Sequence, residues 1–143
     1  MHENIVILEG NLTRDPELSY TKNGRPKTVL GLAVSRRWRN RNTDTWEEHV
    51  SFFNVVCWAD LANHVAESLA QGDRVRVSGR LEQRSWTTDG DEKRSIIEVV
   101  AGDVAPSLRF NAVDVDRSDK SAADANSETD TPPVTYPEGE EPF

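Results

Sequence analysis

The chain has 143 residues, with 17 Lys and Arg against 25 Asp and Glu and a formal net charge of −8. This length accommodates one ordinary domain with an appendage. The charge is uneven, because residues 111–143 hold 9 Asp and Glu against 2 Lys and Arg, whereas residues 1–110 hold 16 against 15. The acidity of the chain therefore does not exclude a nucleic acid as the partner of residues 1–110.

The N-terminus and the single cysteine indicate a cytoplasmic protein with no membrane partner. The opening MHENIVILEG has Glu3 where a signal peptide has basic residues, and its apolar run, Ile5 to Leu8, is too short for a signal peptide or a membrane span. Cys57 is the only cysteine, which excludes an intramolecular disulfide and is typical of a reducing compartment.

In chain order, the first elements are predicted strands. NIVILEGNL is a β-branched run that ends near the Asp15-Pro16 turn, and Asn23-Gly24 is the predicted hairpin turn before the strand TVLGLAVS. A polar, arginine-rich stretch, RRWRNRNTDTWEEH, separates this strand from the next one, VSFFNVVCW. We place Trp46 in the loop that this stretch forms.

The hydrophobic period then changes to that of a helix. Leu61, Val65 and Leu69 recur every four residues in ADLANHVAESLAQG, which predicts three helical turns that end with Gly72 as the C′ residue. Period two returns in DRVRVSGRLEQRSW, and RSIIEVVAGDVAPSLRF supplies the last strand after the turn TTDGDEK.

This order predicts an all-β body, residues 1–110, with five strands and one short helix between the third and fourth strands. That is the plan of the OB-fold barrel, and a five-stranded barrel of another type is the alternative. Residues 111–143 are rich in Asp, Ser, Ala and Thr and have few large apolar residues. Because they bury too little surface to offset the entropy of ordering, we predict a disordered acidic tail.

Arginines lie close to tryptophans at two places. In RRWRNR, four arginines surround Trp38: Arg36, Arg37, Arg39 and Arg41. In the fourth strand, regular alternation puts apolar residues on one face. The other face then carries four arginines and a tryptophan: Arg74, Arg76, Arg80, Arg84 and Trp86. A bulge at Gly79 would break this alternation. Guanidinium groups contact phosphates and flat rings stack on unpaired bases, so the pattern favours single-stranded nucleic acid. The alternative is a solvated, charged strand face.

The third strand is apolar on both faces. Alternation puts Phe52, Asn54, Val56 and Trp58 on one face and Phe53, Val55 and Cys57 on the other. Some of these side chains must belong to the core, and we expect a partner subunit or bases to cover one of the faces. We expect Cys57 to act as a buried small hydrophobe.

No other chemistry is predicted. His2, His49 and His64 lie far apart, and none has a carboxylate or cysteine at ligand spacing, so we expect no metal site and no cofactor. The sequence has no Gly-rich phosphate loop and no G-x-S-x-G motif. An enzyme, for instance a nuclease that uses carboxylates, therefore has no motif to support it, and we assign no catalytic residue.

Two long segments resemble the signature blocks of the bacterial single-stranded DNA-binding protein family, without gaps: NIVILEGNLTRDPELSYTKNG and VVCWADLANHVAESLAQGDRVRVSGRLEQRSW. The resemblance implies an OB-fold, a homotetramer that wraps single strands with little sequence preference, and no catalysis. It implies base stacking by four aromatic residues: Trp38, Phe52, Trp58 and Trp86. We assign no stacking role to Trp46. The chain departs from the family at Phe52-Phe53, where an aromatic residue followed by His is common at a position associated with subunit contacts.

The C-terminus, EGEEPF, resembles the acidic C-terminal tip of the same family. The resemblance implies that this tip recruits replication, recombination and repair proteins. Phe143 with its terminal carboxylate suits an apolar pocket flanked by basic residues, and Pro142 restricts the backbone beside it. Glu138, Glu140 and Glu141 would steer the approach. The alternative is an OB-fold accessory or replication-restart module that acts mainly through protein contacts, although such modules generally lack this tip.

Overall fold

The computed structural model describes residues 2–117. The chain divides into two units, Met1–Ala112 and Val113–Phe143. Residues 111–117 contain neither helix nor strand. The predicted tip, from Glu138 to Phe143, lies outside the described residues, as does the rest of the tail beyond residue 117.

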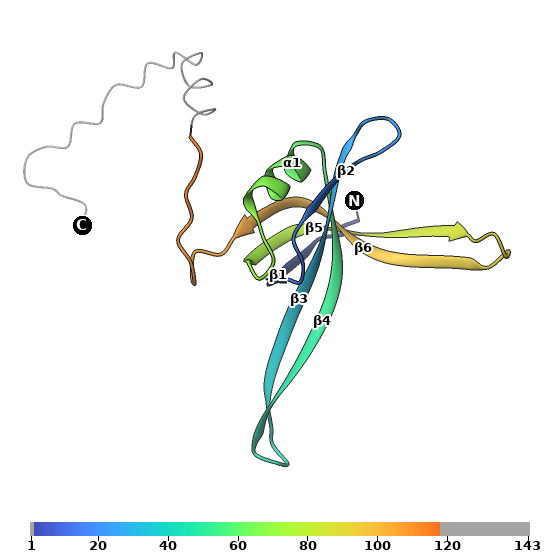
Figure 1. Ribbon diagram of the computed structural model, residues 1–143. Coiled ribbons are helices and arrows are strands. Elements are labelled where there is room, and N and C mark those ends of the chain that lie inside the picture. The colour runs from blue at the N-terminus through green and yellow to red at the C-terminus, as the bar shows by residue number, and fades with distance from the viewer. Residues whose placement is uncertain (1, 118–143) are drawn as a thin grey trace, which may run out of the picture. The chain divides into compact units, whose positions relative to one another are not determined.

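A closed barrel with one helix forms the first unit. Its elements are β1 (Val6–Leu12), β2 (Glu17–Tyr20), β3 (Pro26–Asn40), β4 (Thr45–Trp58), α1 (Ala59–Ser68), β5 (Arg74–Thr87) and β6 (Lys93–Pro106). The sheet order is β1-β5-β6-β4-β3-β2, and a further β1–β3 pairing closes five of these strands into a ring (Figure 1). β2 is a short antiparallel strand on β3 that the sequence did not predict. The prediction of a five-stranded OB-fold barrel, with one helix between its third and fourth strands, is confirmed.

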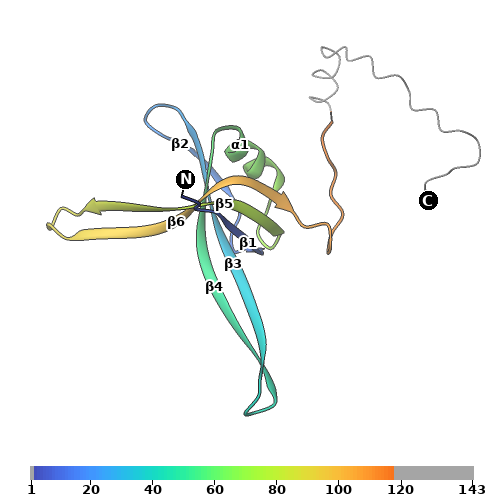
Figure 2. The same ribbon diagram turned by 180° about the vertical axis from the view of Figure 1, so that it is seen from behind.

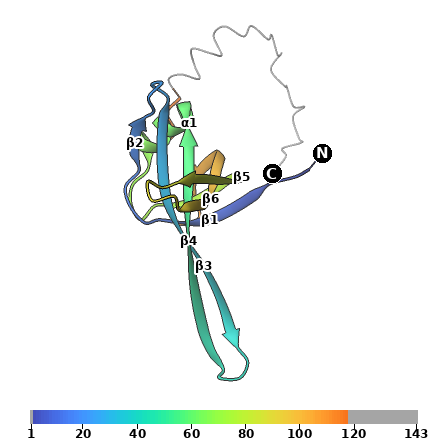
Figure 3. The same cartoon turned by 90° about the vertical axis from the view of Figure 1, so that its right-hand side faces the viewer.

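The core lies inside the ring and under the helix. The fully buried side chains of the barrel include Leu30, Leu32, Val55, Val75 and Val77. From α1, Ala62 and Val65 pack on the same cluster, and the Thr28 hydroxyl of β3 donates a hydrogen bond of 3.1 Å to the Ala62 carbonyl. α1 therefore covers one end of the barrel, opposite the end from which the β3–β4 hairpin projects (Figures 1 and 3).

Local turn chemistry explains one confirmed prediction and one error. Gly24 has φ of 78°, and its N–H donates to the Thr21 carbonyl at 2.8 Å, so the predicted Asn23-Gly24 turn is present. Gly72 was predicted to be the C′ residue of the helix, which is wrong. The helix ends at Ser68, followed by an extended Leu69. Gly72 instead belongs to the turn before β5, where its N–H donates to the Leu12 carbonyl at 2.8 Å.

The prediction of a polar loop over RRWRNRNTDTWEEH is also wrong. β3 and β4 continue through this stretch as a two-stranded ribbon. Their register is unbroken from the pair Lys27–Trp58 to the pair Asn40–Thr45. Only Arg41–Asp44 form the turn. Trp46 therefore lies in β4, opposite Arg39. In a two-stranded ribbon, the backbone groups of the two strands form hydrogen bonds with each other, and neither face of the ribbon has to be buried. A polar sequence can therefore form such a ribbon.

Two hairpins extend beyond the barrel in different directions (Figures 1 and 2). We call residues 35–50 the β3–β4 arm and residues 81–98 the β5–β6 arm. α1, with 10 residues, is the only helix among residues 2–117, and no helix there is long and apolar enough to cross a membrane.

Candidate nucleic-acid interface

The β3–β4 register decides which side of the ribbon each aromatic residue occupies. Residues directly opposite each other in a pair share a side. Leu30 is opposite Val55 on the side that lines the core. Trp58, Phe52 and Trp46 belong to the other, outward side, where they stand opposite Lys27, Ala33 and Arg39. Trp38 is opposite Glu47 and belongs to the inward side, beyond the end of the barrel.

The aromatic residues differ in exposure. Phe52 is 73% exposed, Trp46 63% and Trp86 43%, whereas Trp38 and Trp58 are half-buried. Phe53, on the inward side beyond the packed core, is 36% exposed. Val55, Val56 and Cys57 are the buried part of the third barrel strand. The expectation that some residues of this apolar strand belong to the core is therefore confirmed, and its aromatic rings lie mostly outside that core.

Every tryptophan in the chain has a cation over its ring. The Arg36 guanidinium lies 5.1 Å from the centroid of Trp38, Arg37 lies 5.4 Å from Trp46, and Arg84 lies 5.6 Å from Trp86. Trp58 has two cations, Arg25 at 4.5 Å and Lys27 at 5.3 Å. Such contacts hold a positive charge beside a flat apolar surface, which is the combination that a stacked base and its phosphate require.

The eight predicted arginines fall into two groups by their acidic neighbours. Four form ion pairs with carboxylates: Arg39 with Asp44, Arg76 with Glu9 at 3.1 Å, Arg80 with Glu82 at 3.3 Å and Arg84 with Glu98 at 3.7 Å. These four guanidinium groups are exposed, so each pair is weak and still leaves donors available. The other four have no carboxylate partner among residues 2–117: Arg36, Arg37, Arg41 and Arg74.

The predicted alternation of β5 is present. Val75 and Val77 are fully buried, while Arg76 on the opposite face is exposed. A register shift does occur between Ser78 and Gly79, but the extra residue, Gly102, is in β6. β5 therefore keeps its own period, and Arg74, Arg76, Arg80, Arg84 and Trp86 share a side.

Arg74 differs from the other arginines of β5. Its guanidinium donates to the Asn11 side chain at 3.3 Å and lies 5.1 Å from the centroid of the Phe110 ring. The Ser107 N–H also donates to the Arg74 carbonyl, at 2.9 Å. Arg74 is therefore engaged with the segment that follows β6, and of the four arginines without a carboxylate it is the least free to contact a ligand.

Three residues of this candidate interface are not predicted from the sequence. Arg25 and Lys27 flank Pro26 just before the apolar part of β3, and only the register shows that they meet Trp58. The sequence predicts a loop at Trp46, whereas the residue lies in β4. The signal that identifies it is its spacing, because 46, 52 and 58 are all even positions of one continuous strand.

Nothing among residues 2–117 points to catalysis. Those residues contain no group of three or more His, Cys, Asp or Glu side chains placed to hold a metal ion. Cys57 is fully buried, as predicted, and burial raises the pKa of its thiol to about 12. The thiol is therefore protonated at neutral pH and is not an activated nucleophile.

A small five-stranded OB barrel, with basic and aromatic arms outside its core, defines the class as an oligonucleotide-binding fold. The model of the Single-strand binding protein family matches residues 3–107, and the chain belongs to that family. It is 45% identical over 116 residues to the single-stranded DNA-binding protein of Corynebacterium glutamicum, covering 80% of this chain and 51% of that one. It is 37% identical over 131 residues to that of Mycobacterium tuberculosis, covering 91% of this chain and 80% of the relative.

The chain thus spans about half the length of the Corynebacterium relative. Among solved structures, a Plasmodium falciparum SSB complex with ssDNA matches with a TM-score of 0.68 and 23% identity, covering 75% of this chain and 97% of the other. That likeness supports the fold.

Proposed function

We propose that this chain binds single-stranded DNA with little sequence preference and without catalysis, by base stacking and phosphate contacts. The observation that carries the proposal is that all four tryptophans lie outside the packed core, each with a cation over its ring. Every base has a flat face, so stacking binds a strand whatever its sequence. The stacking residues are Trp38, Phe52, Trp58 and Trp86, and the eight predicted arginines contact phosphates. Membership of a family of non-catalytic DNA-binding proteins supports this assignment.

Tryptophan fluorescence tests the proposal directly. Addition of poly(dT) should quench the emission, because the bases stack on the indoles. The apparent affinity should fall as salt rises, by about 0.7 log units per log unit of salt for each phosphate contacted. Duplex DNA of the same length is the control, since its bases are covered. No quenching with dT oligomers of any length would refute the proposal.

We further propose that the chain works as a homotetramer. From Val6 to Gly10, β1 pairs only with β5, so its other edge is open over these residues. Ile5 and Ile7 beside that edge are exposed. An open edge with exposed apolar side chains is a surface on which another strand can pair. This supports assembly of copies of the chain.

The acidic tail, residues 111–143, is proposed to recruit replication, recombination and repair proteins through its tip. The proposed contacts are those of Phe143 and Pro142 in an apolar pocket, with Glu138, Glu140 and Glu141 steering the encounter. With single-stranded DNA as the ligand, we place the protein in the cytoplasm, at the nucleoid when bound.

Deletion of residues 136–143 is expected to tighten single-stranded DNA binding at low salt. The deleted segment contains three of the nine acidic residues of the tail, and those charges compete with DNA for the arginines. Affinity for a labelled dT oligomer, measured with and without the segment, checks this, and the difference should shrink at high salt. Equal affinities at low salt would limit the tip to a role in protein contacts.

A further inference from the structure

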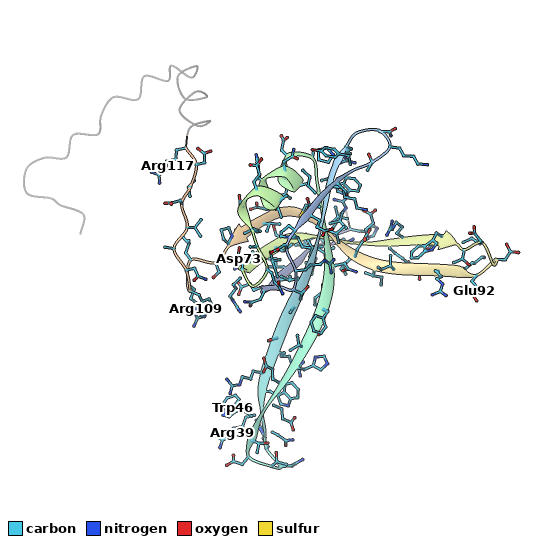
Figure 4. All side chains as sticks on the ribbon, viewed as in Figure 1. Arg39, Trp46, Asp73, Glu92, Arg109 and Arg117 are labelled. Carbon is cyan, nitrogen blue, oxygen red and sulfur yellow. The ribbon has the colours of Figure 1, made fainter. Side chains whose placement is uncertain are left out.

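Trp46 is the most exposed tryptophan of the chain, and it lies near the far end of the β3–β4 arm. Figure 4 places it close to Arg39, its direct cross-strand partner. Its side chain is 63% exposed and belongs neither to the core nor to the residues packed against the core. Packing inside the barrel therefore does not account for the ring.

The position of Trp46 continues the row of aromatic residues on the outward side of β4. Trp58, Phe52 and Trp46 follow one another at intervals of six residues on the same side of an unbroken ladder. At about 3.4 Å per residue, successive rings are about 20 Å apart along the strand. The barrel thus presents the first ring and the arm presents the last.

Arg37 supplies the charge that a stacked nucleotide needs beside it. It lies two pairs further from the turn than Arg39, on the same outward side, and its guanidinium is 5.4 Å from the centroid of the Trp46 ring. Arg37 is exposed and has no carboxylate partner among residues 2–117. Arg39, in contrast, is paired with Asp44. The Arg37 guanidinium therefore covers one face of the Trp46 indole, and the other face can stack on a ligand.

We propose that Trp46 is an additional base-stacking residue, with Arg37 orienting its ring and contacting the adjacent phosphate. A bound strand then extends along the outward side of the β3–β4 arm almost to its turn. The inference rests on the proposed binding of single-stranded DNA. The inference adds a base-stacking subsite on the β3–β4 arm. It also places the two tryptophans of that arm on opposite sides of the ribbon, Trp38 on the inward side and Trp46 on the outward side.

A chain with Trp46 as its only tryptophan isolates this subsite. Replacing Trp38, Trp58 and Trp86 by phenylalanine keeps a ring at each of those positions. Emission from Trp46 should then be quenched when a dT oligomer is added, while anisotropy of a labelled oligomer reports binding independently. Binding without quenching would overturn the inference and leave the proposed function intact. A wild-type chain that binds no dT oligomer would instead overturn the proposed function.

Affinity provides the second measurement. Trp46→Ala should weaken binding of a labelled dT oligomer about 5- to 150-fold, the loss expected for one base–ring stack. Trp46→Phe should retain most of the affinity, because it keeps a flat ring. Thr45→Ala, at the adjacent exposed position on the other side of the ribbon, is the matched control and should bind like wild type. Wild-type affinity in Trp46→Ala would refute the subsite.

Discussion

Replacing Trp38 and Trp86 together by alanine is expected to weaken binding of a dT oligomer by roughly 30-fold to 10⁴-fold. Each ring accounts for about 1–3 kcal/mol if it stacks on one base. Trp38 is on the β3–β4 arm and Trp86 on the β5–β6 arm, so the two share no strand and their losses should add. Anisotropy of a labelled oligomer, measured at one salt concentration for all variants, gives the affinities.

The structure predicts that this double variant still folds. Neither ring belongs to the core cluster, which is built from residues such as Leu30, Val55 and Val77. The midpoint of urea unfolding should therefore remain close to that of the wild type. The double replacement Trp38→Phe/Trp86→Phe keeps two flat rings and should recover most of the affinity. If the alanine variant is fully folded and binds like wild type, the two rings are not part of the interface.

Gly10→Ala is expected to lower the free energy of unfolding by about 3 kcal/mol, the upper part of the range for overpacked sites. A β-carbon at Gly10 would overlap the carbonyl oxygen of Ala33 and would lie 2.9 Å from its carbonyl carbon. Both are backbone atoms of β3, so no side chain can rotate to make room. The strands must separate where β1 and β3 close the barrel, at the pairs of Asn11 with Ala33 and Leu12 with Leu32.

Gly90→Ala is the matched control for this prediction. Gly90 lies in the turn of the β5–β6 arm, and a β-carbon there would have no atom within 4 Å. Its free energy of unfolding should stay within about 0.5 kcal/mol of wild type. Urea unfolding followed by circular dichroism measures both variants. A loss of less than about 1 kcal/mol for Gly10→Ala would mean that the barrel can open at β1–β3 without strain.

The arms show where sequence patterns stop being informative. Inside the barrel, a strand buries one face, so apolar residues recur with period two and the strand is visible in the sequence. Beyond the barrel, both sides of the ribbon face solvent, and residues such as Arg37 and Glu48 carry no such alternation. The prediction therefore ended β3 near Ser35 and began β4 near Val50, although both strands run on to the turn at Arg41–Asp44.

Contacts between segments that lie far apart in the chain could not be predicted from the sequence either. The ion pair of Arg76 with Glu9 joins residues 67 positions apart, and it exists because β1 and β5 are neighbours in that register. Arg25 and Lys27 meet Trp58 for the same reason, through the pairing of β3 with β4. From composition alone, the eight predicted arginines were equivalent. The structure separates those that have a carboxylate neighbour from those that do not.

Local chemistry in the sequence alone determined the strands of the barrel, its single helix, the Asn23-Gly24 turn and the enrichment of arginine around tryptophan. These features depend on neighbours within a few residues, so the sequence patterns that indicate them can be recognised without knowledge of the fold. The length of the arms, the partners of the arginines and the side of the ribbon that each ring occupies are visible only in the folded protein. Those properties follow from strand register, and a shift of one residue would exchange Trp46 with its neighbours on the opposite side.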